Sequence, residues 1–254
     1  QQSNSVSKKT SFRWTVVALL FFATTVNYFD RFLMGILAPL LETEIGWTEQ
    51  QYGYIIASFQ FAYAGGTLLM GYLIDRLGTR WGFTIAVSLW SIASMLHAAA
   101  RSWVGFAFAR IGLGLSEAGN FPAAIKTVAE WFPKKERAFA TGLFNGGSNV
   151  GAILAPLTVP FIIAQFGSWR WAFILSGFLG FFWLIFWLIL YKKPKESKFT
   201  NQAERDFIQD GEPGEETLKI SWINLLKYKQ TWAVALGKLL ADPVWYFYLF
   251  WGAK

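Results

Sequence analysis

Long apolar stretches alternate with short polar ones along almost the whole chain. Each stretch is close to the length of about 20 mostly apolar residues that crosses a bilayer as a helix. The stretches cover residues 14–41, 51–73, 81–100, 103–127, 138–166 and 170–191, with the start of a seventh at 231–251. The pattern predicts an all-α integral membrane protein with a six-helix bundle and part of a seventh transmembrane helix.

The polar segment at 192–230 separates the sixth apolar stretch from the seventh. It opens with lysines, continues through acidic residues mixed with glycine and proline, and closes with an amphipathic run at 221–226. We expect a solvated cytoplasmic linker that ends in a short surface helix. The predicted organisation is a tail at 1–13, a six-helix bundle at 14–191, a linker at 192–230 and a further span at 231–254.

Composition agrees with a membrane protein, because 54% of the residues are hydrophobic, only 15% are charged, and the mean hydropathy is +0.33. The net charge is +7, but the basic residues gather in loops on one side of the predicted spans. They are Lys8, Lys9, Arg13, Arg76, Arg80, Lys134, Lys135, Arg137, Lys192, Lys193, Lys195 and Lys198. This asymmetry predicts a multi-pass inner (plasma) membrane protein with a cytoplasmic N-terminus rather than a nucleic-acid-binding protein. No cleavage site follows a short apolar core, so we expect the first span to be retained.

Several classes of chemistry lack their usual residues. The chain has no cysteine and one histidine, His97, which argues against disulfides, thiolate metal sites and zinc sites. We expect His97 to serve packing in the third span. The sequence shows neither a Ser-His pair in register nor a cluster of metal ligands, which argues against an enzyme. The charges inside the spans argue against an open channel. We therefore expect neither enzymatic activity nor a cofactor.

Two pairs of charges interrupt the apolar stretches. Asp30 and Arg31 lie within the first span, and Arg110 and Glu117 lie within the fourth. A charge near the middle of a span costs at least about 2.5–3.5 kcal/mol, so these side chains must face protein, water or ligand. Arg110 and Glu117 are two turns apart on one helical face, and we expect them to act as neighbours. Either pair is also consistent with a structural ion pair.

The loop between the second and third spans carries a spaced motif. Gly71, Asp75, Arg76, Gly78 and Arg80 resemble the signature of the major facilitator superfamily, with Thr79 where a second basic residue is common. The resemblance implies a conformational latch in this loop and two six-helix halves, each an inverted 3+3 repeat, with the substrate between the halves. This chain is expected to supply the N-terminal half, with the C-terminal half of the same transporter as its missing partner.

The charged motifs narrow the resemblance. The stretch from Asn27 to Arg31, together with Arg110 to Pro122, is similar to the anion:cation symporter family, whose members carry organic anions such as sugar acids with protons or sodium. Lys238 to Trp251 resembles the seventh span of bacterial hexuronate transporters. Residues 252–254 depart from the usual continuation, so we expect a fragment or a shortened product. A symporter for another organic anion (aldonate or aldarate) and a non-transporting assembly or sensing fragment remain alternatives.

Residue chemistry assigns provisional roles. The expected substrate-binding residues are Arg31, Tyr28, Tyr63, Arg110 and Asn149. A guanidinium matches a hexuronate carboxylate, whereas the hydroxyl and amide groups suit sugar hydroxyls. The resemblance assigns proton coupling to Asp30 and Glu117, since burial disfavours a charged carboxylate and a nearby arginine favours it. Co-transported H⁺ is expected, and Na⁺ is the less favoured coupling ion.

Overall fold

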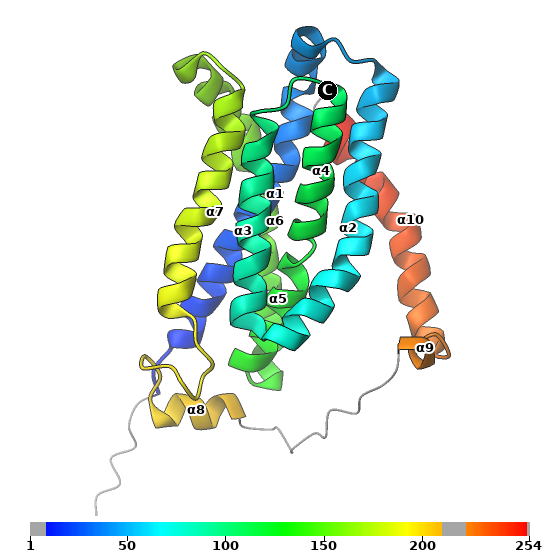
Figure 1. Cartoon of the computed structure of the whole chain (residues 1–254). Helices are drawn as coiled ribbons and strands as arrows, with labels where there is room; N and C mark the ends of the chain where they lie inside the picture. The colour runs from blue at the N-terminus through cyan, green and yellow to red at the C-terminus, as the bar shows by residue number, and fades with distance from the viewer. Residues whose placement is uncertain (1–8, 210–221, 253–254) are drawn as a thin grey trace, which may run out of the picture.

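The computed structural model describes residues 9–209 and 222–252, and every regular element within these ranges is an α-helix. The helices are α1 (Phe12–Ile45), α2 (Glu49–Leu77), α3 (Thr79–His97), α4 (Trp103–Glu117), α5 (Asn120–Trp131), α6 (Lys134–Phe166), α7 (Arg170–Leu190), α8 (Gln202–Gln209), α9 (Trp222–Leu225) and α10 (Lys229–Trp251). The long helices form one elongated bundle, with α8 lying across one end, called here the α8 end (Figure 1). The all-α prediction is confirmed. Two predictions lie outside the described residues. One concerns the tail at 1–8, and the other concerns the acidic part of the linker and the first residue of its amphipathic run, at 210–221.

The helices pair in a symmetric pattern. α1 packs chiefly on α6, α2 on α4, and α3 on α7. α4 and α5 together form the predicted fourth span, so α6 is the fifth span and α7 the sixth. An inverted three-helix repeat exchanges spans one and four, two and five, and three and six. That exchange converts the α1–α6 pair into the α4–α2 pair and leaves the α3–α7 pair unchanged. The observed helix pairs therefore agree with an inverted repeat.

Glycines set the closest of these contacts. A Cβ at Gly147 or Gly151 would collide with the backbone of α1, and one at Gly114 would collide with the Phe59 carbonyl of α2. Small residues let helix backbones approach closely within a membrane. The glycine-rich part of the predicted fifth span therefore serves helix packing.

Four helices of the described residues are long and apolar enough to cross a membrane, judged by length and composition. They are α1, α6, α7 and α10. The other predicted spans correspond to α2, α3 and the α4–α5 pair. The fourth span is interrupted, because α4 ends at Glu117 and α5 begins at Asn120.

The expectation of a fully solvated linker is wrong for its first part, which contains α8. Glu204 of α8 is fully buried and accepts hydrogen bonds from the backbone N–H groups of Phe12 and Arg13, both at 3.2 Å. Its carboxylate also pairs with the Arg13 guanidinium at 3.1 Å. The N-cap residue of α1, Ser11, makes no side-chain cap, so a carboxylate from a distant segment stabilises this positive helix end.

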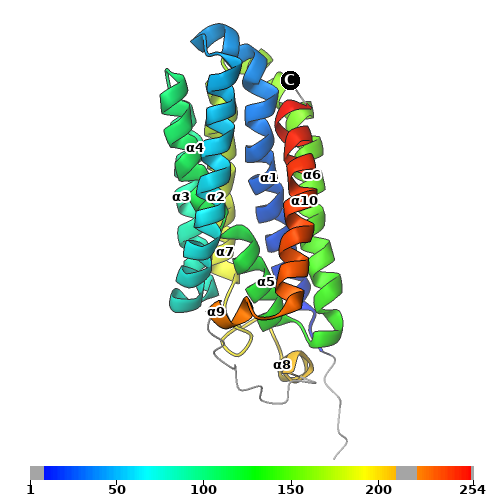
Figure 2. The same ribbon diagram turned by 90° about the vertical axis from the view of Figure 1, so that its right-hand side faces the viewer.

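α10 runs alongside the bundle from the α8 end toward the other end (Figure 2). It is anchored near its C-terminus, where Leu249 and Phe250 are buried and the Tyr52 hydroxyl donates a 2.8 Å hydrogen bond to the Phe250 carbonyl. Gly35 of α1 faces the Leu249 carbonyl there. The rest of α10 is largely exposed, so its most buried contact with the six-helix bundle is near its C-terminus.

Candidate functional site

A buried ion pair joins the first and fourth spans. The Arg31 Nε atom donates to Glu117 Oε2 at 2.9 Å, and the two side chains are 2% and 0% exposed. Glu117 was expected to act beside Arg110, but its hydrogen-bonded partner is Arg31. Residues seven apart on one helix are separated by roughly 10 Å along its axis, so the arginine across the helix interface is the nearer one. Removing one partner of such a pair typically costs about 3–5 kcal/mol.

Two tyrosines flank the Arg31 guanidinium. Its Cζ lies 4.4 Å from the ring centroid of Tyr63 and 4.9 Å from that of Tyr28. Both tyrosines are half-buried, so their rings can hold the cation while part of each side chain stays accessible. The structure thus brings together three of the five expected substrate-binding residues.

Arg110 is fully buried, and none of its three guanidinium nitrogens has a hydrogen-bond partner within the described residues. Its Cζ lies 5.4 Å from the ring of Phe59, and that of Arg31 lies 5.6 Å from the same ring. The two guanidiniums therefore converge on one aromatic side chain. A buried, unpaired cation is costly, which makes Arg110 a candidate contact for an anion or for ordered water.

Asp30 points to a different set of neighbours from Arg31, since adjacent helical residues diverge by about 100°. The Ser94 hydroxyl donates to Asp30 Oδ1 at 2.9 Å and lies 2.8 Å from the Ser176 hydroxyl. The other carboxylate oxygen of Asp30 has no hydrogen-bond partner among the described residues. Asp30 is therefore held by α3 and α7, and not in an ion pair with Arg31.

Asn149, unlike the four charged residues, is not buried. Its side chain is exposed on α6, while Gly147 and Gly151, two residues to either side, face α1. Residues two apart on a helix point in nearly opposite directions. The structure therefore does not place Asn149 on the α1-facing side of α6.

The loop residues expected to form a latch contact other helices of the same bundle. Asp75 pairs with Lys126 of α5 at 2.8 Å, and Arg80 donates to the Leu188 carbonyl of α7 at 2.6 Å. Arg76 contacts Tyr72. Gly71 lies in α2, and Gly78 has a positive φ of 79° where α2 gives way to α3. The latch role itself stays a prediction.

Two further groups complete the polar interior. His97 is fully buried, its Nδ1 lies 2.8 Å from the Ala93 carbonyl, and its ring stacks on Phe173 at 4.8 Å, which is a packing arrangement. Tyr246 of α10 is half-buried, and its ring stacks on Phe250 at 6.2 Å. The sequence stretch around Tyr246 was recognised, but no role was assigned to it, because nothing along the chain indicates which helix it will face.

Comparison with known proteins places the chain in a family of transporters. It is 40% identical over 237 residues to the hexuronate transporter of Escherichia coli (strain K12), covering 92% of this chain and 55% of that protein. It is 37% identical to the galacturonate transporter of Dickeya chrysanthemi, covering 92% of this chain and 68% of that protein. The chain thus spans roughly half to two thirds of the length of these relatives.

Two solved transporter structures share the fold of this chain. A bacterial homolog of the human lysosomal transporter Spinster, inward-facing and occupied, matches with a TM-score of 0.65 and 22% identity over 74% of this chain and 46% of that one. The inward-open xylose transporter XylE from E. coli matches with a TM-score of 0.64 and 17% identity over 72% of this chain and 49% of that one. The Major Facilitator Superfamily profile matches residues 20–253. The chain therefore belongs to the major facilitator superfamily, with the helices of an N-terminal half.

Proposed function

We propose that this chain forms the N-terminal half of a secondary active transporter that carries hexuronates, such as galacturonate or glucuronate, together with protons. The observation that carries the proposal is the buried Arg31–Glu117 ion pair, whose arginine lies between Tyr28 and Tyr63. A planar guanidinium can bind a carboxylate bidentately. The relatives named as hexuronate and galacturonate transporters support this substrate class.

The ion pair offers a direct coupling mechanism. While Glu117 is ionised it compensates Arg31, and a substrate carboxylate must compete with it for the same guanidinium. Protonation of Glu117 removes that competition, so Arg31 becomes free to bind the anionic substrate. When the substrate leaves, Arg31 returns to Glu117 and favours release of the proton. Proton and anion thus bind together because each removes the electrostatic cost of the other.

Asp30 and Arg110 extend the mechanism. Arg110, buried without a hydrogen-bonded partner in the described residues, supplies a second positive charge for the substrate carboxylate. Asp30 interacts electrostatically with both Arg110 and Arg31 and is the second proton acceptor. Protonation of Asp30 leaves the two arginines with more uncompensated positive charge, which favours an anion at their shared aromatic contact.

The loops also suggest an orientation. The basic loop residues lie in segments at the α8 end, at 76–80, 134–137 and 192–198. The positive-inside tendency supports a cytoplasmic α8 end, and with it a cytoplasmic N-terminus, in the inner (plasma) membrane that we propose for this protein. Aldonates and aldarates are the competing substrate classes, because other relatives are named as transporters of D-galactonate and of galactarate and D-glucarate.

Uptake of labelled galacturonate into proteoliposomes tests the proposal, using the protein as its gene encodes it. We expect accumulation under an imposed pH gradient, and Glu117→Gln should abolish accumulation while galacturonate exchange across the membrane continues. Glu44→Gln is the matched control, because Glu44 is an exposed partner of Arg170. Retained accumulation in Glu117→Gln, or accumulation driven by sodium alone, would refute proton coupling through this residue. A preference for a neutral hexose would refute the carboxylate argument.

A further inference from the structure

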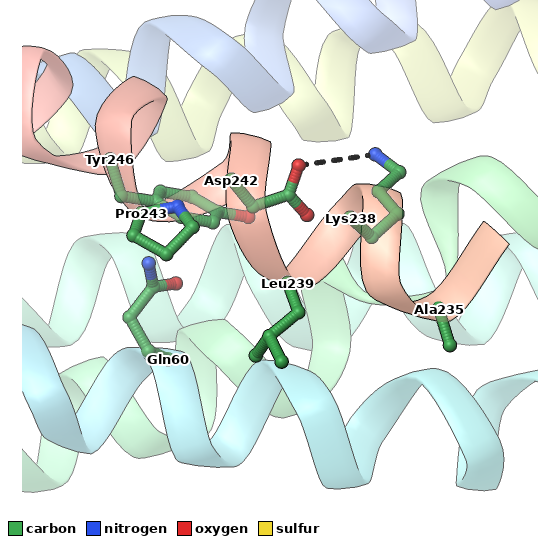
Figure 3. A pocket seen from close by; sticks show the side chains of 7 residues that line it. All are labelled: Gln60, Ala235, Lys238, Leu239, Asp242, Pro243 and Tyr246. Atoms are coloured by element: carbon green, nitrogen blue, oxygen red, sulfur yellow. Dashed lines mark hydrogen bonds and ion pairs between the residues drawn. The ribbon is translucent and has the colours of Figure 1, made fainter. Parts of the chain in front are cut away.

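A pocket of about 450 Å³ lies between α2 and α10. Its volume falls within the range of roughly 300–1,000 Å³ that is typical of small-molecule sites. The lining residues are Gln60, Ala235, Lys238, Leu239, Asp242, Pro243 and Tyr246 (Figure 3). Four of these side chains are polar, so the pocket is suited to a hydroxylated ligand.

The polar groups come from both walls. In Figure 3 the Gln60 amide extends from α2 toward Pro243 and Tyr246, while Lys238 and Asp242 project from the same side of α10 and face each other. Lys238 Nζ and Asp242 Oδ1 are 3.4 Å apart, and the two side chains are 71% and 40% exposed. Their head groups are therefore paired with each other and still accessible to a ligand.

A series of aromatic contacts leads from the pocket to the buried cation. The ring of Tyr246 stacks on that of Phe250 at 6.2 Å, and Phe250 contacts Phe59 at 6.3 Å. The Phe59 ring lies 5.6 Å from Arg31 Cζ, so aromatic rings link the pocket to the cation. A sugar acid with its carboxylate on Arg31 can therefore direct its opposite end toward α10. No other described residue on the α10 wall of this pocket carries a charge, so the Lys238–Asp242 pair determines the electrostatics of that end.

We propose that this pocket receives the end of the sugar acid remote from its carboxylate, and that the Lys238–Asp242 pair makes it select an uncharged, hydroxylated end over a second carboxylate. The inference rests on the proposed function and adds its specificity. A sugar hydroxyl both donates and accepts hydrogen bonds, so it can accept from the Lys238 ammonium and donate to the Asp242 carboxylate. A second carboxylate only accepts, is repelled by Asp242, and finds Lys238 already compensated. Monocarboxylic sugar acids are therefore bound in preference to dicarboxylic ones.

Galacturonate and galactarate share the configuration of their hydroxyl-bearing carbons, but galacturonate closes into a ring with a hemiacetal at its remote end, whereas galactarate is an open chain with a second carboxylate there. Galactonate, an open chain with one carboxylate and a hydroxyl at its remote end, is the control for the ring and should follow galacturonate. Dissociation constants are measured by equilibrium binding to the protein as its gene encodes it, in lipid nanodiscs. The unaltered protein should prefer galacturonate. Asp242→Asn leaves Lys238 uncompensated and should lower the ratio of the galactarate to the galacturonate dissociation constant by roughly tenfold, the effect of one charge-assisted hydrogen bond.

The reciprocal variants keep the test decisive. Lys238→Gln leaves Asp242 uncompensated, so galactarate should bind no better than before and galacturonate a few-fold more weakly. The double variant should lose the gain in galactarate binding seen with Asp242→Asn. Lys229→Gln removes the same charge from α10 outside the pocket and should leave the ratio unchanged.

The outcomes separate the subsite from the transporter proposal. If Asp242→Asn binds galacturonate normally and keeps the wild-type ratio of the galactarate to the galacturonate dissociation constant, the subsite proposal is overturned and the proposed function stays intact. Improved galactarate binding in Lys238→Gln would also overturn the subsite proposal. This measurement tests the subsite even if Asp242→Asn does not fold. Binding of neither acid by the unaltered protein would refute the proposed function, and the subsite with it.

Discussion

Replacing Glu204 with alanine should release α8 from the start of α1. The substitution removes the acceptor for the Phe12 and Arg13 backbone N–H groups and for the Thr10 hydroxyl, which lies 2.5 Å away, and it leaves the nearly buried Arg13 guanidinium without this partner. Loss of a helix cap costs about 0.5–2 kcal/mol, and breaking a buried ion pair costs about 3–5 kcal/mol. These contributions overlap, and Arg13 keeps Glu136 at 3.0 Å. We therefore expect a total of about 3 kcal/mol.

Hydrogen exchange read by mass spectrometry measures this local opening. A cost of about 3 kcal/mol corresponds to a fall in protection of roughly 100-fold. The fall should be confined to peptides covering 9–16 and 200–209, whereas the α2–α4 interface should keep its protection. Asp206→Asn is the matched control on the same helix, because Asp206 is exposed and its carboxylate accepts a hydrogen bond from Gln202.

Glu204 caps the start of α1 across 191 or more residues of sequence. Unchanged protection at both peptides in the alanine variant would show that α8 is held by other contacts. A uniform loss of protection throughout the bundle would instead show that Glu204 supports global stability and not a local junction.

Three further substitutions test the packing, the cation and the loop. Gly151→Leu should force α1 and α6 apart, which should lower the yield of folded protein and reduce its melting temperature by several degrees. Gly142→Ala is the control, because Gly142 has open space beside it. Equal melting temperatures in the two variants would contradict close packing at Gly151. Arg31→Lys should weaken galacturonate binding roughly 10-fold or more through loss of bidentate geometry, with Arg170→Lys unchanged, as measured by equilibrium binding. Asp75→Asn should change stability by less than about 1 kcal/mol, since its side chain is 75% exposed; a fall in uptake without a fall in melting temperature is expected of a latch, and unchanged uptake would contradict that role.

The membrane fold and the location of the buried charges followed from the sequence. The lengths of the apolar runs placed the helices to within several residues, and the cost of a charge in hydrocarbon identified Asp30, Arg31, Arg110 and Glu117 as groups that must face the interior. α8 escaped prediction because it is only eight residues long, and a helix that short is not stable by itself. Its stability depends on a contact with α1 that sequence spacing does not reveal.

The sequence by itself determined which residues leave the lipid, and with them the helical class, the family motif and the chemistry available for an anion. Only the tertiary structure decided that Glu117 pairs with Arg31, that Asp30 turns to Ser94, and that Asn149 is exposed. Periodicity specifies which residues share a face of one helix, but the rotation of each helix against its neighbours is set by contacts such as Gly151 on α1. Because a charge pair forms only across the interface that this rotation creates, partners cannot be assigned before the helices are packed.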